Sequence, residues 1–188
     1  MGDWHCDIPD WDKITKETAA IILAQSEAYL KETIESAKLI SAKADRLFGI
    51  LLPIASGLVV FIINDFSNKR VGGLTISAVL SFLLIAVSLF YSFLNVLNYK
   101  IGVVGNYPRE LFKIELINDK ITKDDQYILM FIYVCESIQA KLVRNNESNT
   151  IRAERNKKAL IALIGIPFTP LIAYPLFYLF QNCHCVSP

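Results

Sequence analysis

The chain has few of the residues on which enzyme active sites most often depend. It contains two histidines in 188 residues, His5 and His184, and they lie at opposite ends of the sequence. A His-based triad or a His general acid–base pair is therefore not indicated. A glycine-rich phosphate loop is also missing, because the Gly102–Gly105 segment lacks the Lys-Ser or Lys-Thr that such a loop needs, and we interpret this segment as a hinge.

Cysteine is equally uninformative. No pair of the four cysteines has CxxC spacing, which argues against structural zinc and against a disulfide-stapled secreted fold. The Cys183-His184-Cys185 cluster is the most suggestive grouping, but adjacent residues rarely reach one metal together. The carboxylates that could be imagined as a metal site are better explained as a solvated face and a helix cap: Glu115, Asp119, Asp124 and Asp125. We predict neither a metal nor a cofactor.

Charge is missing from three long stretches of the chain. Leu47–Ile63 has 17 residues and Val71–Tyr99 has 29, and neither contains a charged side chain. A bilayer core needs roughly 20 apolar helical residues, so the two stretches predict a transmembrane helical hairpin. Ala159–Phe180 adds 22 uncharged residues and predicts a third span, although its three prolines also fit a re-entrant or interfacial segment.

The segments between these stretches have helical patterns. Trp11–Arg46 contains no Gly or Pro, and its apolar residues recur every seven positions, which predicts an amphipathic helix running directly into the first span. Arg109–Ile117 predicts a short amphipathic helix, and Thr122 with the following aspartates predicts the start of a further, strongly periodic one. We expect the polar run 144–150 to interrupt that helix.

These patterns predict an all-α, multi-pass helical membrane protein with a cytoplasmic helical layer. Its parts are a cytoplasmic N-terminal helix (1–46), a transmembrane hairpin (47–99), a cytoplasmic helical region (100–158) and a third apolar segment (159–188). Two basic residues, Lys69 and Arg70, flank the spans on one side, against ten on the other, which places the N-terminus in the cytoplasm. The ten are Lys38, Lys43, Arg46, Lys100, Arg109, Lys113, Arg152, Arg155, Lys157 and Lys158.

The second apolar stretch carries small polar residues on one helical face. We call this set the polar stripe; it consists of Ser77, Ser81, Ser88, Ser92 and Asn95. Small polar residues on one face of a membrane helix favour helix–helix packing and interhelical hydrogen bonds. The lining of a pore is the alternative, and the pattern leaves both open.

The basic segment from Arg144 to Lys158 is the remaining candidate for binding. Its charges could contact RNA phosphates or anionic lipid head groups. They could equally be the flanking charge that orients the third span.

The layout as a whole resembles a known family. A long helix feeds the span through Lys-Ala-Asp-Arg-Leu-Phe-Gly-Ile-Leu-Leu-Pro (Lys43 to Pro53), and a hairpin and a helical return follow. This resembles the accessory membrane protein of type VI-B CRISPR systems, which has a divergent HEPN motif, and is similar in layout to two-span effectors of anti-phage signalling. The resemblance implies an oligomeric, pore-forming protein of the bacterial inner membrane that supports RNA-guided antiphage immunity.

The HEPN signature is an Arg followed, after four to six residues, by a His. Two pairs match its Arg, namely Arg144 with Asn149 and Arg152 with Lys157, but neither ends in His. Asn and Lys cannot shuttle a proton near neutral pH as imidazole does, so ribonuclease activity is not expected.

We therefore predict a non-enzymatic homo-oligomer that acts on the lipid membrane. The alternatives are a membrane-tethered HEPN-like ribonuclease, or an adaptor that recruits a CRISPR nuclease complex or RNA.

Overall fold

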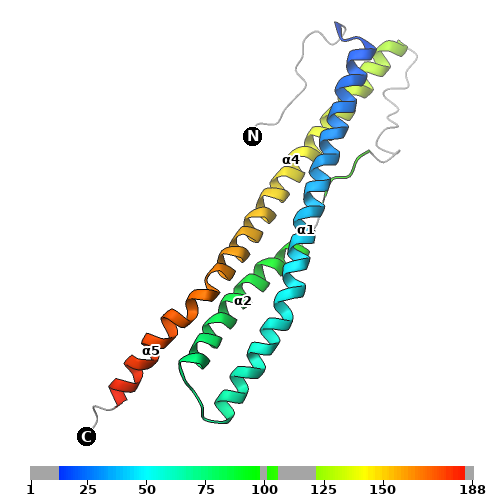
Figure 1. Cartoon of the computed structure of the whole chain (residues 1–188). Coiled ribbons are helices and arrows are strands. Elements are labelled where there is room, and N and C mark those ends of the chain that lie inside the picture. Colours follow the sequence, from blue (N-terminus) through cyan, green and yellow to red (C-terminus); the bar gives the residue numbers. More distant parts are fainter. Residues whose placement is uncertain (1–12, 98–100, 106–121, 185–188) are drawn as a thin grey trace. The chain divides into compact units, whose positions relative to one another are not determined.

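The computed structural model describes residues 13–97, 101–105 and 122–184, with side chains described as far as Leu179. Every regular element in these ranges is a helix (Figure 1): α1 (Lys16–Ser67), α2 (Gly73–Leu97), α4 (Lys123–Ile164), the short 3₁₀ helix η3 (Ile166–Phe168) and α5 (Thr169–His184). Three helical stretches, Lys16–Ser67, Gly73–Leu97 and Lys123–Leu179, are long and apolar enough to cross a membrane. The prediction of an all-helical chain with three long apolar helices is confirmed.

Contacts divide the chain into two compact units. Unit 1 comprises Met1–Leu39 and Lys100–Thr150, and unit 2 comprises Ile40–Tyr99 and Ile151–Pro188. The predicted boundaries at 46/47 and 158/159 fall inside the helices α1 and α4. The expected continuity of the N-terminal helix with the first apolar stretch is confirmed, because α1 runs unbroken from Lys16 to Ser67 and accommodates Pro53.

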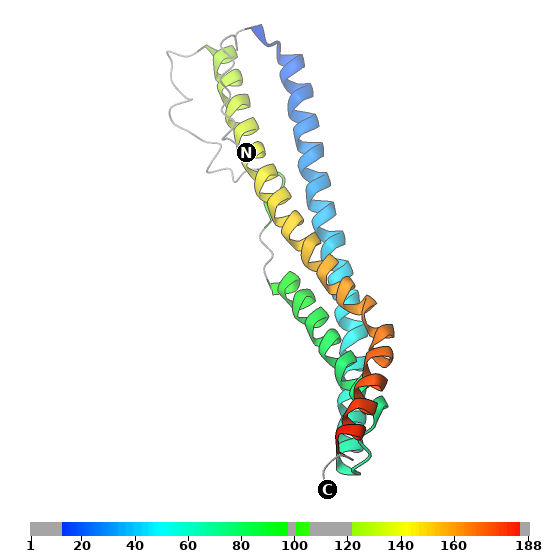
Figure 2. The same ribbon diagram turned by 90° about the vertical axis from the view of Figure 1, so that its left-hand side faces the viewer.

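Unit 1 is built on a parallel pair of helices, the first part of α1 and the first part of α4. They lie side by side in both ribbon views (Figures 1 and 2), and their buried residues pair in ascending order along both chains. Ala19 packs with Phe131 and Cys135, and Leu30 packs with Ile138 and Leu142. The four buried residues of α4 are thus separated by four, three and four residues, which is the spacing of a coiled-coil interface.

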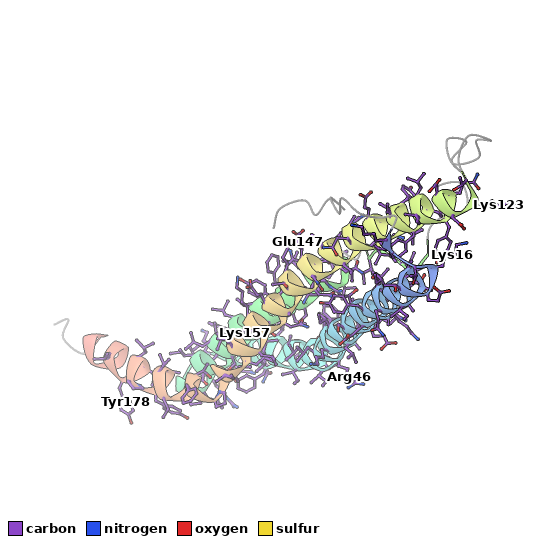
Figure 3. All side chains as sticks on the ribbon, turned by 90° about the horizontal axis from the view of Figure 1, so that it is seen from above. Lys16, Arg46, Lys123, Glu147, Lys157 and Tyr178 are labelled. Atoms are coloured by element: carbon purple, nitrogen blue, oxygen red, sulfur yellow. The ribbon has the colours of Figure 1, made fainter. Side chains whose placement is uncertain are left out.

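Both helices of unit 1 begin with a threonine cap. The backbone N–H of Thr18 donates to the Thr15 hydroxyl, and the backbone N–H of Asp125 donates to the Thr122 hydroxyl, each over 3.2 Å. The predicted helix start at Thr122 is thus confirmed. Lys16 forms an ion pair with Asp124, so the two starts are neighbours, as the labels of Lys16 and Lys123 in Figure 3 show. The hydrogen bond to Asp124 raises the pKa of Lys16.

The expected interruption at residues 144–150 is wrong. Helix α4 continues through the whole polar run as far as Ile164. Asn145 and Asn149 keep the spacing of the buried residues before them, and their amides bond to Thr33 of α1 instead of competing with the α4 backbone.

Unit 2 contains the second part of α1, all of α2, the end of α4, η3 and α5. Helix α2 runs antiparallel to α1 and also to the α4–α5 segment, as the ribbon in Figure 1 shows. Leu51 and Ala55 of α1 pack with Ile85 of α2, and Leu163 and Ile166 border this cluster.

The turn between α1 and α2 closes with a Schellman motif. The N–H of Arg70 donates to the carbonyl of Asp65, and the N–H of Lys69 donates to the carbonyl of Phe66. Lys69 consequently takes a left-handed conformation, with φ at 53°. Asp65 also accepts a 2.6 Å hydrogen bond from the Thr75 hydroxyl, which ties the end of α1 to the first turn of α2.

We expect Lys69→Gly to stabilise the hairpin by about 1 kcal/mol, because the left-handed conformation costs a residue with a Cβ atom that much relative to glycine. Thermal unfolding in detergent, followed by circular dichroism, measures the change. Lys69→Ala is the control, since it removes the charge but keeps the Cβ. An equal gain from both variants would contradict the conformational explanation.

Prolines interrupt the third apolar stretch. Helix α4 ends at Ile164, Pro167 lies in η3, and α5 begins at Thr169. Gly165, between α4 and η3, lets the backbone lie close to α2, because a Cβ atom there would be 3.0 Å from the Leu84 side chain. Gly73, the first residue of α2, likewise lets the backbone lie close to the Tyr174 ring of α5.

Candidate functional site

Unit 2 buries polar side chains and exposes apolar ones. All five residues of the polar stripe are buried. Large apolar side chains on the other faces of the same helices are exposed, for example Ile50, Val60, Leu83, Phe90, Phe93, Leu171 and Tyr178. A water-soluble helical bundle shows the opposite distribution, so this interior calls for an explanation.

One end of the polar stripe is fully hydrogen-bonded. Ser77 and Ser81 lie 3.1 and 2.8 Å from the hydroxyl of Thr169. Thr169 donates its own proton to the carbonyl of Ile166 over 2.9 Å. Its oxygen therefore accepts from both serines, and this end of α2 is fixed to the start of α5.

The other end of the polar stripe is an amide network between three helices. The Asn95 amide donates to the Asn156 side chain over 2.7 Å and to the backbone carbonyl of Arg152 over 3.1 Å. Asn156 in turn donates to the carbonyl of Ile40 over 3.1 Å. Arg152, with only 1% of its surface exposed, donates to the hydroxyl of Ser41.

The middle of the polar stripe is not satisfied. Ser88 and Ser92 are fully buried, and within the described part of the chain their hydroxyls have no hydrogen-bond partner. The same holds for the side-chain oxygen of Asn95. A buried polar atom without a partner costs about 1–3 kcal/mol, so this part of the helix contact is weaker than an apolar one of equal shape.

Two cations of α4 hold the C-terminal end of α2. Arg155 donates to the carbonyl of Leu94 over 3.2 Å, one of the last four carbonyls of α2, which have no partner within the helix. The Lys158 ammonium lies 5.8 Å from the centre of the Tyr91 ring. These contacts mark the level at which the charged part of α4 meets the uncharged part.

The four HEPN-like candidates do not come together as the pairs that the motif suggested. Arg144 is exposed, whereas Asn149 donates to the backbone carbonyl of Thr33 over 2.9 Å. Arg152 is buried, whereas Lys157 is exposed. Residues five apart on a helix are rotated by about 140°, so each pair points in two directions.

Sequence reasoning missed Thr169 and Asn156, the buried partners of the polar stripe, and the half-buried Ser41, which accepts from Arg152. It also missed an amide clamp in unit 1. Asn145 is fully buried and donates to Thr33 and to the carbonyl of Gly102, both over 3.1 Å. Its oxygen accepts from the N–H of Gly102 over 2.8 Å. The backbone N–H and the carbonyl of Gly102, which we interpreted above as part of a hinge, are therefore both fixed by Asn145. Extending the alternating three- and four-residue spacing of α4 beyond Leu142 would have identified Asn145 and Asn156 as buried positions.

Several of the residues considered as metal ligands lie outside the part of the chain that the structure describes, as does the predicted short helix 109–117. Glu115, Asp119 and Cys185 are not among the described residues, and the side chains of Cys183 and His184 are not described. Among the described residues no group of three or more His, Cys, Asp or Glu side chains is arranged to hold a metal ion. Cys135 packs in the unit 1 core, where burial raises the pKa of its thiol.

No family model, curated protein or solved structure matches the chain. The resemblance to the CRISPR accessory membrane protein therefore stays a prediction.

Proposed function

We propose that the chain is a non-enzymatic effector of bacterial antiphage defence, which assembles into a homo-oligomer and makes the inner membrane permeable to small ions. The described conformation is then the closed form of one subunit. The N-terminus and unit 1 lie in the cytoplasm, and the turn between α1 and α2 faces outward.

The distribution of charge in unit 2 supports insertion in a membrane. Its segments 47–64, 71–97 and 159–184 carry no charged side chain, and Asp65, Lys69 and Arg70 lie at one end. Arg46, Arg155, Lys157 and Lys158 lie at the other end. The cation–π contact of Lys158 with Tyr91 is typical of the interface between hydrocarbon and head groups, where aromatic and basic side chains gather.

The observation that carries the proposal is the unsatisfied middle of the polar stripe. From Ser77 to Asn95 the stripe extends over 19 residues, about 27 Å of helix, which nearly equals the thickness of the hydrocarbon core. Packing alone would favour Ala at Ser88 and Ser92, since neither hydroxyl has a partner among the described residues. Hydroxyls without partners are suited to a surface that becomes hydrated when the helices separate.

Ion flux from lipid vesicles tests the proposal. We expect purified full-length protein to release potassium from vesicles faster than protein-free vesicles do. The double variant Ser88→Ala/Ser92→Ala should lower this rate by roughly fivefold, because it removes polar groups from the conduit. Its stability should be unchanged or higher, because it breaks no hydrogen bond.

Ser56→Ala is the matched control. Ser56 lies on the exposed face of α1 and donates only to the Leu52 carbonyl of its own helix. This variant should release potassium at the wild-type rate. Wild-type vesicles that retain potassium as well as protein-free vesicles would contradict the proposed function.

A further inference from the structure

The polar stripe is interrupted once, by Ile85. The stripe positions follow each other at helical spacing as Ser77, Ser81, Ser88 and Ser92, and Ile85 occupies the same face between the two inner serines. It is 2% exposed and is among the largest fully buried side chains of the described structure. Polar groups thus lie on both sides of a single large apolar residue.

Apolar side chains from the neighbouring helices surround Ile85. Leu51 and Ala55 of α1 pack against it, and Leu163 of α4 and Ile166 of η3 complete the cluster. The serine–threonine contact to Thr169 lies on one side of this apolar layer, and the amide network of Asn95 lies on the other. By helical rise, Ile85 is about 6 Å from the level of Ser81 and about 4.5 Å from that of Ser88.

We propose that Ile85 is the hydrophobic gate of the conduit, and this inference rests on the proposed function. A short apolar constriction excludes water, and hydrated ions with it, even where the flanking surfaces are polar. Ser88 and Ser92, buried and without partners among the described residues, form the polar vestibule next to the gate. No side chain of the stripe is ionisable, so the conduit is not expected to select between small cations and small anions.

The test replaces the gate residue by a hydroxyl. Ile85→Ser completes the polar stripe, and we expect it to raise potassium and chloride flux from vesicles by about tenfold over wild type. Ile85→Thr should act in the same direction with a smaller loss of packed volume, which covers the case in which the serine variant does not fold. Ile85→Val has nearly the shape of Ile85→Thr but no hydroxyl, so it should raise the flux by less than Ile85→Thr does.

Val87→Ser is the matched control for a polar substitution in the same helix. Val87 is 46% exposed and faces away from the polar stripe, so its variant should conduct like wild type. Equal increases from Ile85→Ser and Val87→Ser would indicate general disruption and overturn the gate.

Two further outcomes separate the gate from the function on which it rests. If wild type conducts ions and neither Ile85→Ser nor Ile85→Thr, when folded, conducts faster, the gate is overturned but the conduit remains. Flux at the protein-free rate from wild type and from every variant would overturn both. A variant is included in the comparison only if it elutes as a single species in detergent and has the helical content of wild type.

Discussion

Asn145→Ala is expected to destabilise unit 1 by about 3 kcal/mol. The substitution removes three hydrogen bonds, two to the backbone of Gly102 and one to Thr33, each worth about 1 kcal/mol. It also leaves the N–H and carbonyl of Gly102 without these partners. Hydrogen exchange at residues 101–105 and in the first part of α4 measures the loss, and we expect exchange to accelerate there by about two orders of magnitude.

Asn146→Ala is the matched control for this prediction. The two asparagines are adjacent on α4, but Asn146 is exposed, so its replacement should change stability by less than about 0.5 kcal/mol. If both variants exchanged at the same rate, the clamp on Gly102 would not be a source of stability.

Arg152→Ala is the second substitution for which a large effect is expected, a loss of about 2–4 kcal/mol. The side chain is 1% exposed, its guanidinium donates to Ser41 between α4 and α1, and its stem fills space within unit 2. Truncation removes charge-assisted hydrogen bonding and packing together. Chemical unfolding in detergent measures the change.

Arg144→Ala separates this structural role from a catalytic one. Arg144 is exposed on the same helix, and we expect its replacement to leave stability within about 0.5 kcal/mol of wild type. A HEPN-like nuclease would instead cleave RNA and lose that activity on replacement of its motif arginine without unfolding. Cleavage of RNA by purified wild-type protein, abolished in a stably folded Arg144→Ala or Arg152→Ala variant, would contradict our assignment.

The helices of this protein follow from local sequence patterns. Uncharged stretches of sufficient length predicted the apolar helices, and the Thr122 hydroxyl with its acidic neighbours predicted the start of α4. The helical spacing of Ser77 to Asn95 also placed these residues on one face. Each of these signals depends on neighbours within a few turns, so no knowledge of the tertiary structure is needed to interpret them.

The pairing of helices could not be derived in the same way. Asn145 and Thr33 are 112 residues apart, and a polar run such as 144–150 is typical of a loop unless a distant helix supplies partners for its amides. The burial of Arg152 has the same cause, because Ser41 lies on a different helix. The role that we propose for Ile85 was equally hidden, since an isoleucine in an apolar stretch is unremarkable until the surrounding serines are known to be buried.

The mass of the detergent-extracted protein distinguishes an oligomeric conduit from a monomer. In the described conformation the polar stripe is buried within one subunit. When its helices separate on opening, three apolar helices cannot enclose the proposed conduit by themselves, so helices of several subunits must complete its wall around the stripe. Light scattering with the detergent contribution subtracted should give a discrete assembly of several 21.2 kDa chains. A monomer across the accessible concentration range would contradict the oligomeric conduit and favour an adaptor that recruits a cytoplasmic partner.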